Sequence, residues 1–301
     1  MKPERKPTLA ESSELWLSLL LRHLPVAWTS AIGGYFGARQ GRKAIAAGRK
    51  WVKRLDGNIE RFSGVADAAE RERRIIEYTR RIGRMYAEFT VLQGIAKEGR
   101  LEVVGGEHLR GLSRPVILAS AHLSNWELVF HVFHRLEGVT CVLYDPPENP
   151  IRHRLAVQAR SGWHPEPELV PASPSAMRQI TRAIGHGRNL LMYVDEEKDG
   201  YIWAPALGRR LPYAGNRWLT ARLAVRYNAD IVPIHVETVG NARYRLIVQP
   251  KLAACEGDAE TRARTLADQM EQHLDAWIRA QPEQWYWLNL LDMDKRLPGA
   301  D

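Results

Sequence analysis

His122 is the residue of this 301-residue chain whose surroundings suggest catalysis most clearly. It follows the apolar run at residues 115–121, which is typical of a buried strand, and it precedes a helical pattern that begins near Ser124. In open α/β sheets, ligands bind beyond the carboxyl ends of the strands. A histidine can also remove a proton from a hydroxyl near neutral pH. The sequence therefore predicts that His122 is a general base.

Glu127 is the carboxylate that we expect to support His122. It is close enough in sequence to fold back onto the ring, where a carboxylate would fix the tautomer and stabilise the imidazolium that forms. A purely structural interpretation is also open, because Ser124 and Glu127 have the spacing of a helix capping box. The sequence contains no G-x-S-x-G motif, so we expect direct attack by an acceptor hydroxyl rather than an acyl-serine. The N-terminus of the following helix would suit a developing oxyanion.

The elements that would position these residues alternate between strand and helix patterns after Gly99. Strands are predicted at 101–104, 115–121, 139–144, 189–194, 229–237 and 244–250. Helices are predicted at 65–98, as one long or two shorter helices, and at about 124–136, 150–162, 174–187, 214–227 and 258–280. This order predicts an α/β fold with a mostly parallel central sheet flanked by helices. The short turn at Gly240 makes the last two strands an expected antiparallel pair at one edge.

The N-terminal region is expected to associate with a membrane. Residues 15–38 are apolar but include Arg22, His23 and Pro25. A charge at the bilayer centre costs roughly 2.5–3.5 kcal/mol, and proline removes a helix hydrogen bond, so an interfacial helix is favoured over a spanning one. Residues 39–54 follow with seven basic and no acidic residues. We therefore predict membrane-associating helices at 1–63 and a catalytic domain at 64–301.

The distribution of charge supports this division. The formal net charge is +8, and residues 1–54 hold the whole excess, with eleven basic and three acidic residues. Such a cationic region fits an anionic leaflet, although a solvated helix face is the alternative. Nucleic acid is not an expected partner because no recognised binding motif accompanies the patch. Two cysteines cannot form a disulfide framework or a four-cysteine zinc site, which favours a reducing compartment.

Residues 122–128, His-Leu-Ser-Asn-Trp-Glu-Leu, resemble the HxGNWEL signature of the lipid A late acyltransferases, which are relatives of the H-x4-D glycerolipid acyltransferases. The resemblance covers most of the chain. Further similar segments are the apolar and basic N-terminus, residues 144–150, Arg160 to Gly162, Asp195, residues 206–233, and the Pro-Glu-Gln-Trp run at 282–285.

The resemblance implies an acyl carrier protein thioester as donor and a hydroxyl of a lipid A precursor or similar glycolipid as acceptor. It places the protein at the cytoplasmic face of the inner membrane and requires no metal and no further cofactor. Carried over by position, His122 is the base and Glu127 is its partner. The positions implied for the substrate site are Asn125, Arg160, Asp195 and Arg217.

Some positions depart from the family pattern. Ser124 stands where the family has glycine, and Glu196 stands after Asp195 where the family has glutamine. Residues 286–293 replace the usual basic run after Pro-Glu-Gln-Trp. These departures bear on the identity of the acceptor more than on the type of reaction, because a site with fewer basic residues would suit an acceptor with fewer phosphate groups. The alternatives are acylation of another lipid or of a carrier-bound acceptor, and a non-catalytic lipid-binding member of the fold. A metal hydrolase is the least favoured class, since one His-x4-Glu lacks the ligands of a zinc site.

Overall fold

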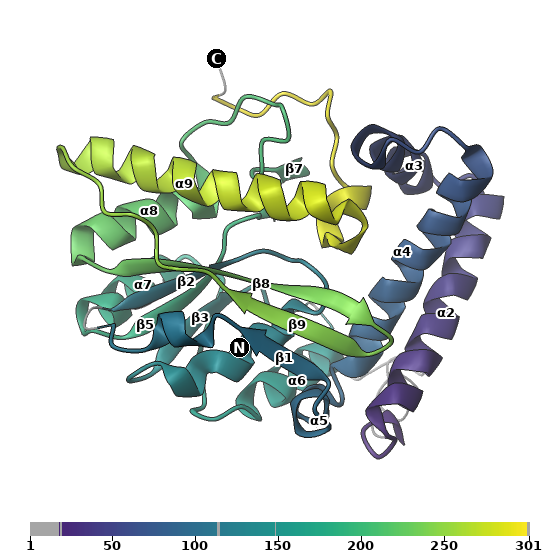
Figure 1. Cartoon of the computed structure of the whole chain (residues 1–301), viewed down its shortest axis with the longest axis horizontal. Coiled ribbons are helices and arrows are strands. Elements are labelled where there is room, and N and C mark those ends of the chain that lie inside the picture. The colour runs from purple at the N-terminus through teal and green to yellow at the C-terminus, as the bar shows by residue number, and fades with distance from the viewer. Residues whose placement is uncertain (1–17, 19, 113–114, 148, 300–301) are drawn as a thin grey trace.

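A seven-stranded sheet lies at the centre of the computed structural model, which describes residues 18, 20–112, 115–147 and 149–299. The strands run in the order β1-β9-β8-β2-β5-β3-β4 (Figure 1). Neighbouring strands are parallel except for β8 and β9, which form an antiparallel pair. Their bounds are β1 Leu101–Val104, β2 Val116–Ser120, β3 Thr140–Tyr144, β4 Glu168–Pro171, β5 Asn189–Tyr193, β8 Asp230–Gly240 and β9 Arg243–Val248. The predicted α/β fold with a mostly parallel sheet is confirmed.

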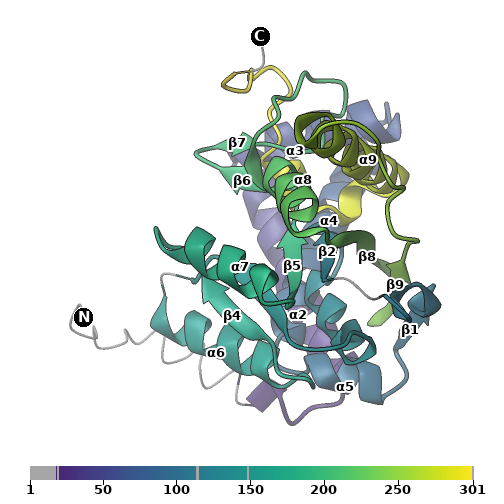
Figure 2. The ribbon, with the colours of Figure 1, turned by 90° about the vertical axis from the view of Figure 1, so that its left-hand side faces the viewer.

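Helices cover both faces of this sheet because its central strands are buried on both sides. In β2, Ile117 and Ala119 belong to one hydrophobic cluster, whereas Val116 and Leu118 belong to the other. The first cluster includes residues of α7 (Ala176–Gly185), α8 (Gly215–Tyr227) and α9 (Ala259–Ala280). The second includes residues of α5 (Leu92–Lys97), η2 (Trp126–Arg135) and α6 (Pro150–Ser161). Figure 2 shows α8 and α9 on one side of the sheet and α5 and α6 on the other.

Three details of the predicted elements were wrong. The antiparallel pair is not at an edge, because β1 pairs with β9 in parallel and covers it. The segment after His122 is a 3-10 helix, η2, rather than an α-helix. Strand β4 was not predicted, since it is only four residues long and ends in Pro171. The predicted helix at 65–98 is divided into α4 (Ala68–Glu88) and α5.

The N-terminal helices pack beside this sheet. Helix α2 (Val26–Ala46) begins directly after Pro25, and α3 (Lys50–Ser63) follows it. Figure 1 shows α2 alongside α4. The two backbones approach closely because Gly37 of α2 faces Thr79 and Gly83 of α4, where a Cβ atom would overlap the carbonyl oxygen of Thr79.

No helix within the described residues is long and apolar enough to cross a membrane. Most of the apolar run at residues 15–21 lies outside the described residues. The predicted boundary between 1–63 and 64–301 falls at the turn between α3 and α4, and the division into two domains stays a prediction.

Small elements complete the fold. The hairpin of β6 (Glu197–Lys198) and β7 (Tyr201–Ile202) follows β5. The 3-10 helix η1 (Gly106–Leu109) follows β1, and η3 (Pro282–Gln284) and η4 (Tyr286–Asn289) follow α9. The segment between η3 and η4 returns to the end of β2, where Leu123 and Trp285 form an antiparallel bridge. This return brings C-terminal residues to the predicted catalytic turn.

Candidate active site

His122 lies just beyond the carboxyl end of β2, between the neighbouring strands β5 and β8. Asp195 stands two residues beyond the end of β5, and its carboxylate is fully buried. One oxygen lies 2.8 Å from Nδ1 of His122. The other accepts the backbone N–H of His122 and the indole N–H of Trp285, each at 2.8 Å. The parallel register of β2 and β5 therefore places a buried carboxylate against His122.

This geometry determines the tautomer of His122. An ionised carboxylate can only accept hydrogen bonds, so the proton must reside on Nδ1. The indole N–H of Trp287 also lies 3.3 Å from Nδ1, but two N–H groups cannot bond to each other, and this approach is therefore packing. Nε2 is left with its lone pair and has no hydrogen-bond partner among the described residues. A neutral imidazole with a free Nε2 can accept a proton from a substrate hydroxyl.

Aromatic side chains surround the His122 ring and leave its side chain 20% exposed. The ring centroids of Tyr193, Trp126 and Trp287 lie 4.5, 4.9 and 5.1 Å from that of His122. Tyr286 is 6.5 Å from His122 and packs edge-on against Trp126. Sequence reasoning did not assign Tyr193, Tyr286 or Trp287 to the site. The aromatic pair directly after Pro-Glu-Gln-Trp was the available signal for the last two.

Glu127 is not the partner of His122, contrary to the sequence prediction. Its buried carboxylate binds Arg160 of α6 through two hydrogen bonds, of 2.9 Å from Nε and 2.5 Å from Nη2. Although burial opposes the charge, Glu127 raises the pKa of Arg160, whose guanidinium also lies over the ring of Tyr144. A 3-10 helix after the turn directs Glu127 toward α6, whereas the sheet register supplies Asp195. Glu127 therefore connects the turn to α6. Asp195, and not Glu127, is the carboxylate that binds His122.

The turn itself has a backbone that the capping-box prediction did not anticipate. Ser124 has φ of 55°, a left-handed conformation that favours glycine, the residue that the related family has here. Its hydroxyl shares a hydrogen bond of 2.6 Å with Thr238 of β8, and its N–H donates to the carbonyl of Gln284. Neither Ser124 nor Glu127 caps η2, so the predicted capping box is wrong. Contacts from β8 and from the C-terminal segment hold the left-handed turn instead.

Asn125 is buried and binds a carboxylate that sequence reasoning missed. Its amide donates to Glu88, the last residue of α4, at 2.8 Å. The hydroxyl of Tyr244 on β9 donates to the same oxygen at 2.5 Å, and burial raises the pKa of that hydroxyl. Glu88 is fully buried, and a buried carboxylate is costly unless its hydrogen bonds are used. No local pattern in the sequence distinguishes Glu88 from Glu70, Glu72 and Glu77, the three other acidic residues of α4.

Arg217 does not lie at this site. Its buried guanidinium donates to the carbonyl of Ala267 on α9 at 3.1 Å and approaches Glu271 at 3.7 Å. It therefore joins α8 to α9, which explains a buried arginine without a substrate. Of the six predicted site residues, the structure brings His122, Asn125, Glu127, Arg160 and Asp195 to the end of β2. The described residues contain no group of three or more potential metal ligands, and the expectation of no metal stays a prediction.

Comparisons with known proteins place this arrangement in context. No curated protein matches the chain. Among solved structures, the crystal structure of the 1-acyl-sn-glycerophosphate (LPA) acyltransferase PlsC from Thermotoga maritima is similar, with 11% identity and a TM-score of 0.39. The match covers 82% of this chain and 97% of that one. Residues 9–291 match a family described as bacterial lipid A biosynthesis acyltransferase, and the chain therefore belongs to that family of lipid acyltransferases.

Proposed function

We propose that this acyltransferase moves a fatty acyl chain from an acyl carrier protein thioester to a hydroxyl of a lipid A precursor or similar glycolipid. The observation that supports this most directly is the free Nε2 of His122, whose ring is held by Asp195. The acceptor hydroxyl gives its proton to Nε2 while its oxygen attacks the thioester carbonyl. The tetrahedral intermediate then loses the thiolate of the carrier, and the imidazolium returns the proton to that sulfur. The products are an ester and the free carrier thiol.

The residues around His122 assist this step in distinct ways. Asp195 keeps the proton on Nδ1 and balances the charge of the imidazolium as it forms. The rings of Trp126, Tyr193 and Trp287 limit the access of water, which would compete with the acceptor hydroxyl. The backbone N–H groups of His122 and Ser124 already donate to Asp195 and Gln284, so neither is free to bind an oxyanion.

Membrane association is proposed for the outer face of α2 and the segment before it. Trp28, Tyr35 and Phe36 have 67%, 59% and 49% of their surface exposed, and Leu20 and Leu24 are exposed as well. The same helix continues into basic residues, of which Arg39 and Arg42 are exposed. Aromatic rings are stable at membrane interfaces and basic side chains favour anionic lipids, which supports an interfacial position at the inner membrane. Vesicle sedimentation with anionic and neutral lipids, comparing wild type with W28S/F36S, would test this.

Donor docking is proposed for the exposed arginines of α7 and α8. Arg178 and Arg182 of α7 and Arg222 of α8 are exposed, whereas Arg217 is committed to α9. Acyl carrier proteins are acidic as a class, so a basic face would attract them. Charge reversal of Arg178 or Arg222 should raise the KM for the donor without changing its kcat, and an unchanged KM would contradict this surface.

The central experiment is an assay of purified protein with a panel of acyl carrier protein and coenzyme A thioesters and with lipid acceptors. Wild type should transfer acyl chains from carrier thioesters to a glycolipid, and H122A should not. H186A, which changes an exposed histidine at the end of α7, is the matched control. In a deletion strain, mass spectrometry should show the loss of one acyl chain from lipid A. Transfer to another lipid would correct the acceptor, and no turnover or thioester hydrolysis with any donor would contradict an enzyme.

A further inference from the structure

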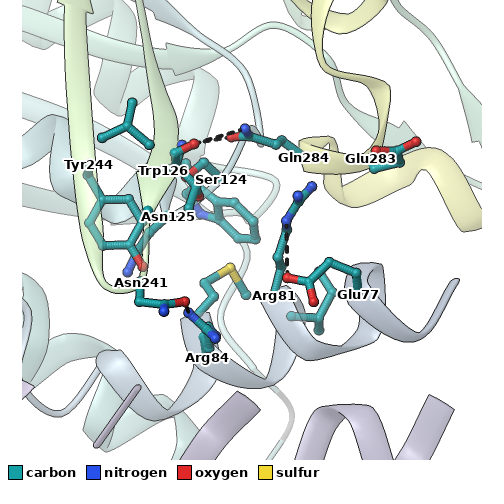
Figure 3. A pocket seen from close by; sticks show the side chains of 15 residues that line it. Glu77, Arg81, Arg84, Ser124, Asn125, Trp126, Asn241, Tyr244, Glu283 and Gln284 are labelled. Atoms are coloured by element: carbon teal, nitrogen blue, oxygen red, sulfur yellow. Dashed lines mark hydrogen bonds and ion pairs between the residues drawn. The ribbon is translucent and has the colours of Figure 1, made fainter. Parts of the chain in front are cut away.

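A cavity of about 290 Å³ lies beside the catalytic turn, on the side of β8. It is bounded by α4, by the tip of the β8–β9 hairpin and by Glu283 and Gln284. In Figure 3, the indole of Trp126 lies in this cavity between Gln284 and Arg81. The same indole packs against His122, with 4.9 Å between ring centroids. Trp126 therefore forms a wall that the cavity and the catalytic histidine share.

Three of the four charged residues that line this cavity, Glu77, Arg81 and Glu283, are in ion pairs within the protein. The four charged residues are Glu77, Arg81, Arg84 and Glu283, so their formal charges cancel. Glu77 accepts Arg80 at 2.9 Å and lies 3.7 Å from Arg81, and Glu283 binds Arg74 at 2.5 Å. A phosphate monoester needs an excess of unpaired cationic donors, which this lining does not provide.

Arg84 has no carboxylate partner among the described residues, and a neutral amide binds it instead. Arg84 donates to the side-chain oxygen of Asn241 at 2.7 Å. Its Nε lies close to Gly34 of α2, where a Cβ atom would come within 2.9 Å of it, and is therefore covered by that helix. Neither lining arginine is thus left as a strong anion site.

The remaining polar groups of the cavity are neutral. Asn125, with 1% of its surface exposed, has a side-chain oxygen without a hydrogen-bond partner. This oxygen is an unsatisfied acceptor, and a buried acceptor of this kind is costly unless a ligand donates to it. Asn241, Tyr244 and Trp126 share the lining. The oxygen of Asn241 already accepts from Arg84 and the hydroxyl proton of Tyr244 already goes to Glu88, so Asn241 offers a ligand its N–H groups and Tyr244 offers a lone pair. The lining therefore offers both acceptors and donors, and hydroxyl groups can bind either, so the set matches a ligand rich in hydroxyls.

We infer that this cavity binds the headgroup of the acceptor lipid, and that this headgroup is an uncharged sugar or other polyol. The inference rests on the proposed function, because it assumes that a lipid hydroxyl is acylated at His122, and it favours the similar glycolipid over a phosphorylated lipid A precursor as the acceptor. The position is suitable for such a lipid, since α4 lines the cavity on one face and packs on its other face against α2, whose outer aromatic residues are exposed. A lipid in the proposed interface could place its headgroup in the cavity and one hydroxyl past Trp126 at Nε2.

The binding test compares dodecyl β-glucoside with dodecyl phosphate, below their micelle concentrations, by isothermal titration calorimetry on the full chain. Wild type should bind the glucoside at least 10-fold more tightly. N241A, which removes an amide from the cavity rim, should weaken glucoside binding about 5-fold, the loss of roughly one hydrogen bond. Q179A, which removes an exposed amide on α7, is the matched control and should bind as wild type does. Tighter binding of dodecyl phosphate that is lost in R81Q would overturn the inference, and so would a glucoside affinity unchanged by N241A.

Kinetics separate this inference from the proposed function. With an acceptor lipid that the enzyme acylates, N241A should raise the KM for the acceptor several-fold and leave the KM for the donor unchanged. If transfer proceeds and N241A does not change the acceptor KM, the headgroup site is wrong and the acyltransferase remains. If the glucoside binds as expected but no donor is turned over, the cavity stands as a polyol site and the proposed reaction fails.

Discussion

Replacement of Asp195 by asparagine should abolish most turnover by reversing the tautomer of His122. Three N–H groups donate to the Asp195 carboxylate, all at 2.8 Å. Asparagine has only one side-chain oxygen. We expect this oxygen to take the position that accepts two hydrogen bonds, from the backbone N–H of His122 and from the indole N–H of Trp285. The NH₂ group of the asparagine then faces Nδ1, which must become an acceptor, and the ring proton moves to Nε2. The nitrogen that should accept the substrate proton is thereby blocked.

The expected magnitude follows from the loss of general-base catalysis. Such catalysis contributes about 10²–10⁴-fold, so kcat should fall by that factor, or roughly 2.7–5.5 kcal/mol of activation free energy. Folding should weaken less, by about 1.5–3 kcal/mol for one charge-assisted hydrogen bond. Steady-state kinetics, thermal unfolding and ¹⁵N NMR of labelled histidine would measure turnover, stability and tautomer.

E127Q provides the comparison, because Glu127 binds Arg160 rather than His122. It should destabilise the fold by roughly 3–5 kcal/mol, since it leaves a buried arginine without its charge partner, but it should keep the proton on Nδ1. If D195N retained near-normal kcat, or if E127Q rather than D195N moved the ring proton, the assignment of Asp195 would be refuted.

The remaining predictions concern catalysis, packing and pH. H122A should lose transfer completely and keep the melting temperature of wild type within a few degrees, so residual turnover in a folded variant would contradict the mechanism. G37A should lower the free energy of unfolding by about 1–3 kcal/mol, because its Cβ would overlap the α4 backbone. G57A has open space and should raise it by about 0.5–1 kcal/mol, and denaturant unfolding of both variants decides this. Burial lowers the pKa of His235, so the unfolded chain binds more protons and stability should fall as pH drops below about 6.5. H235Q should lose less stability than wild type between pH 7 and 5.5 in thermal unfolding, whereas identical pH dependence would exclude this role.

Much of the fold could be predicted because its signals are local. The buried run at β2 and the apolar strands β3, β5 and β8 are continuous in sequence, and helices α7 and α9 have periodic apolar faces. The position of β1 beside β9 could not be predicted in this way. It depends on pairing between segments about 140 residues apart, which no local pattern encodes. The 3-10 form of η2 was missed for a related reason, because contacts from β8 and Gln284 determine the turn before it.

For the site, the sequence was enough to show that His122 follows a buried strand and that a family signature surrounds it. It also determined the cationic N-terminus, since charge is a property of composition. Which carboxylate binds the histidine depends on the three-dimensional fold. Glu127 is five residues away in sequence but binds Arg160, whereas Asp195 is 73 residues away and reaches His122 because β2 and β5 are adjacent and parallel. Hydrogen bonds extend over about 3 Å, so they depend on the register of strands and not on distance along the chain.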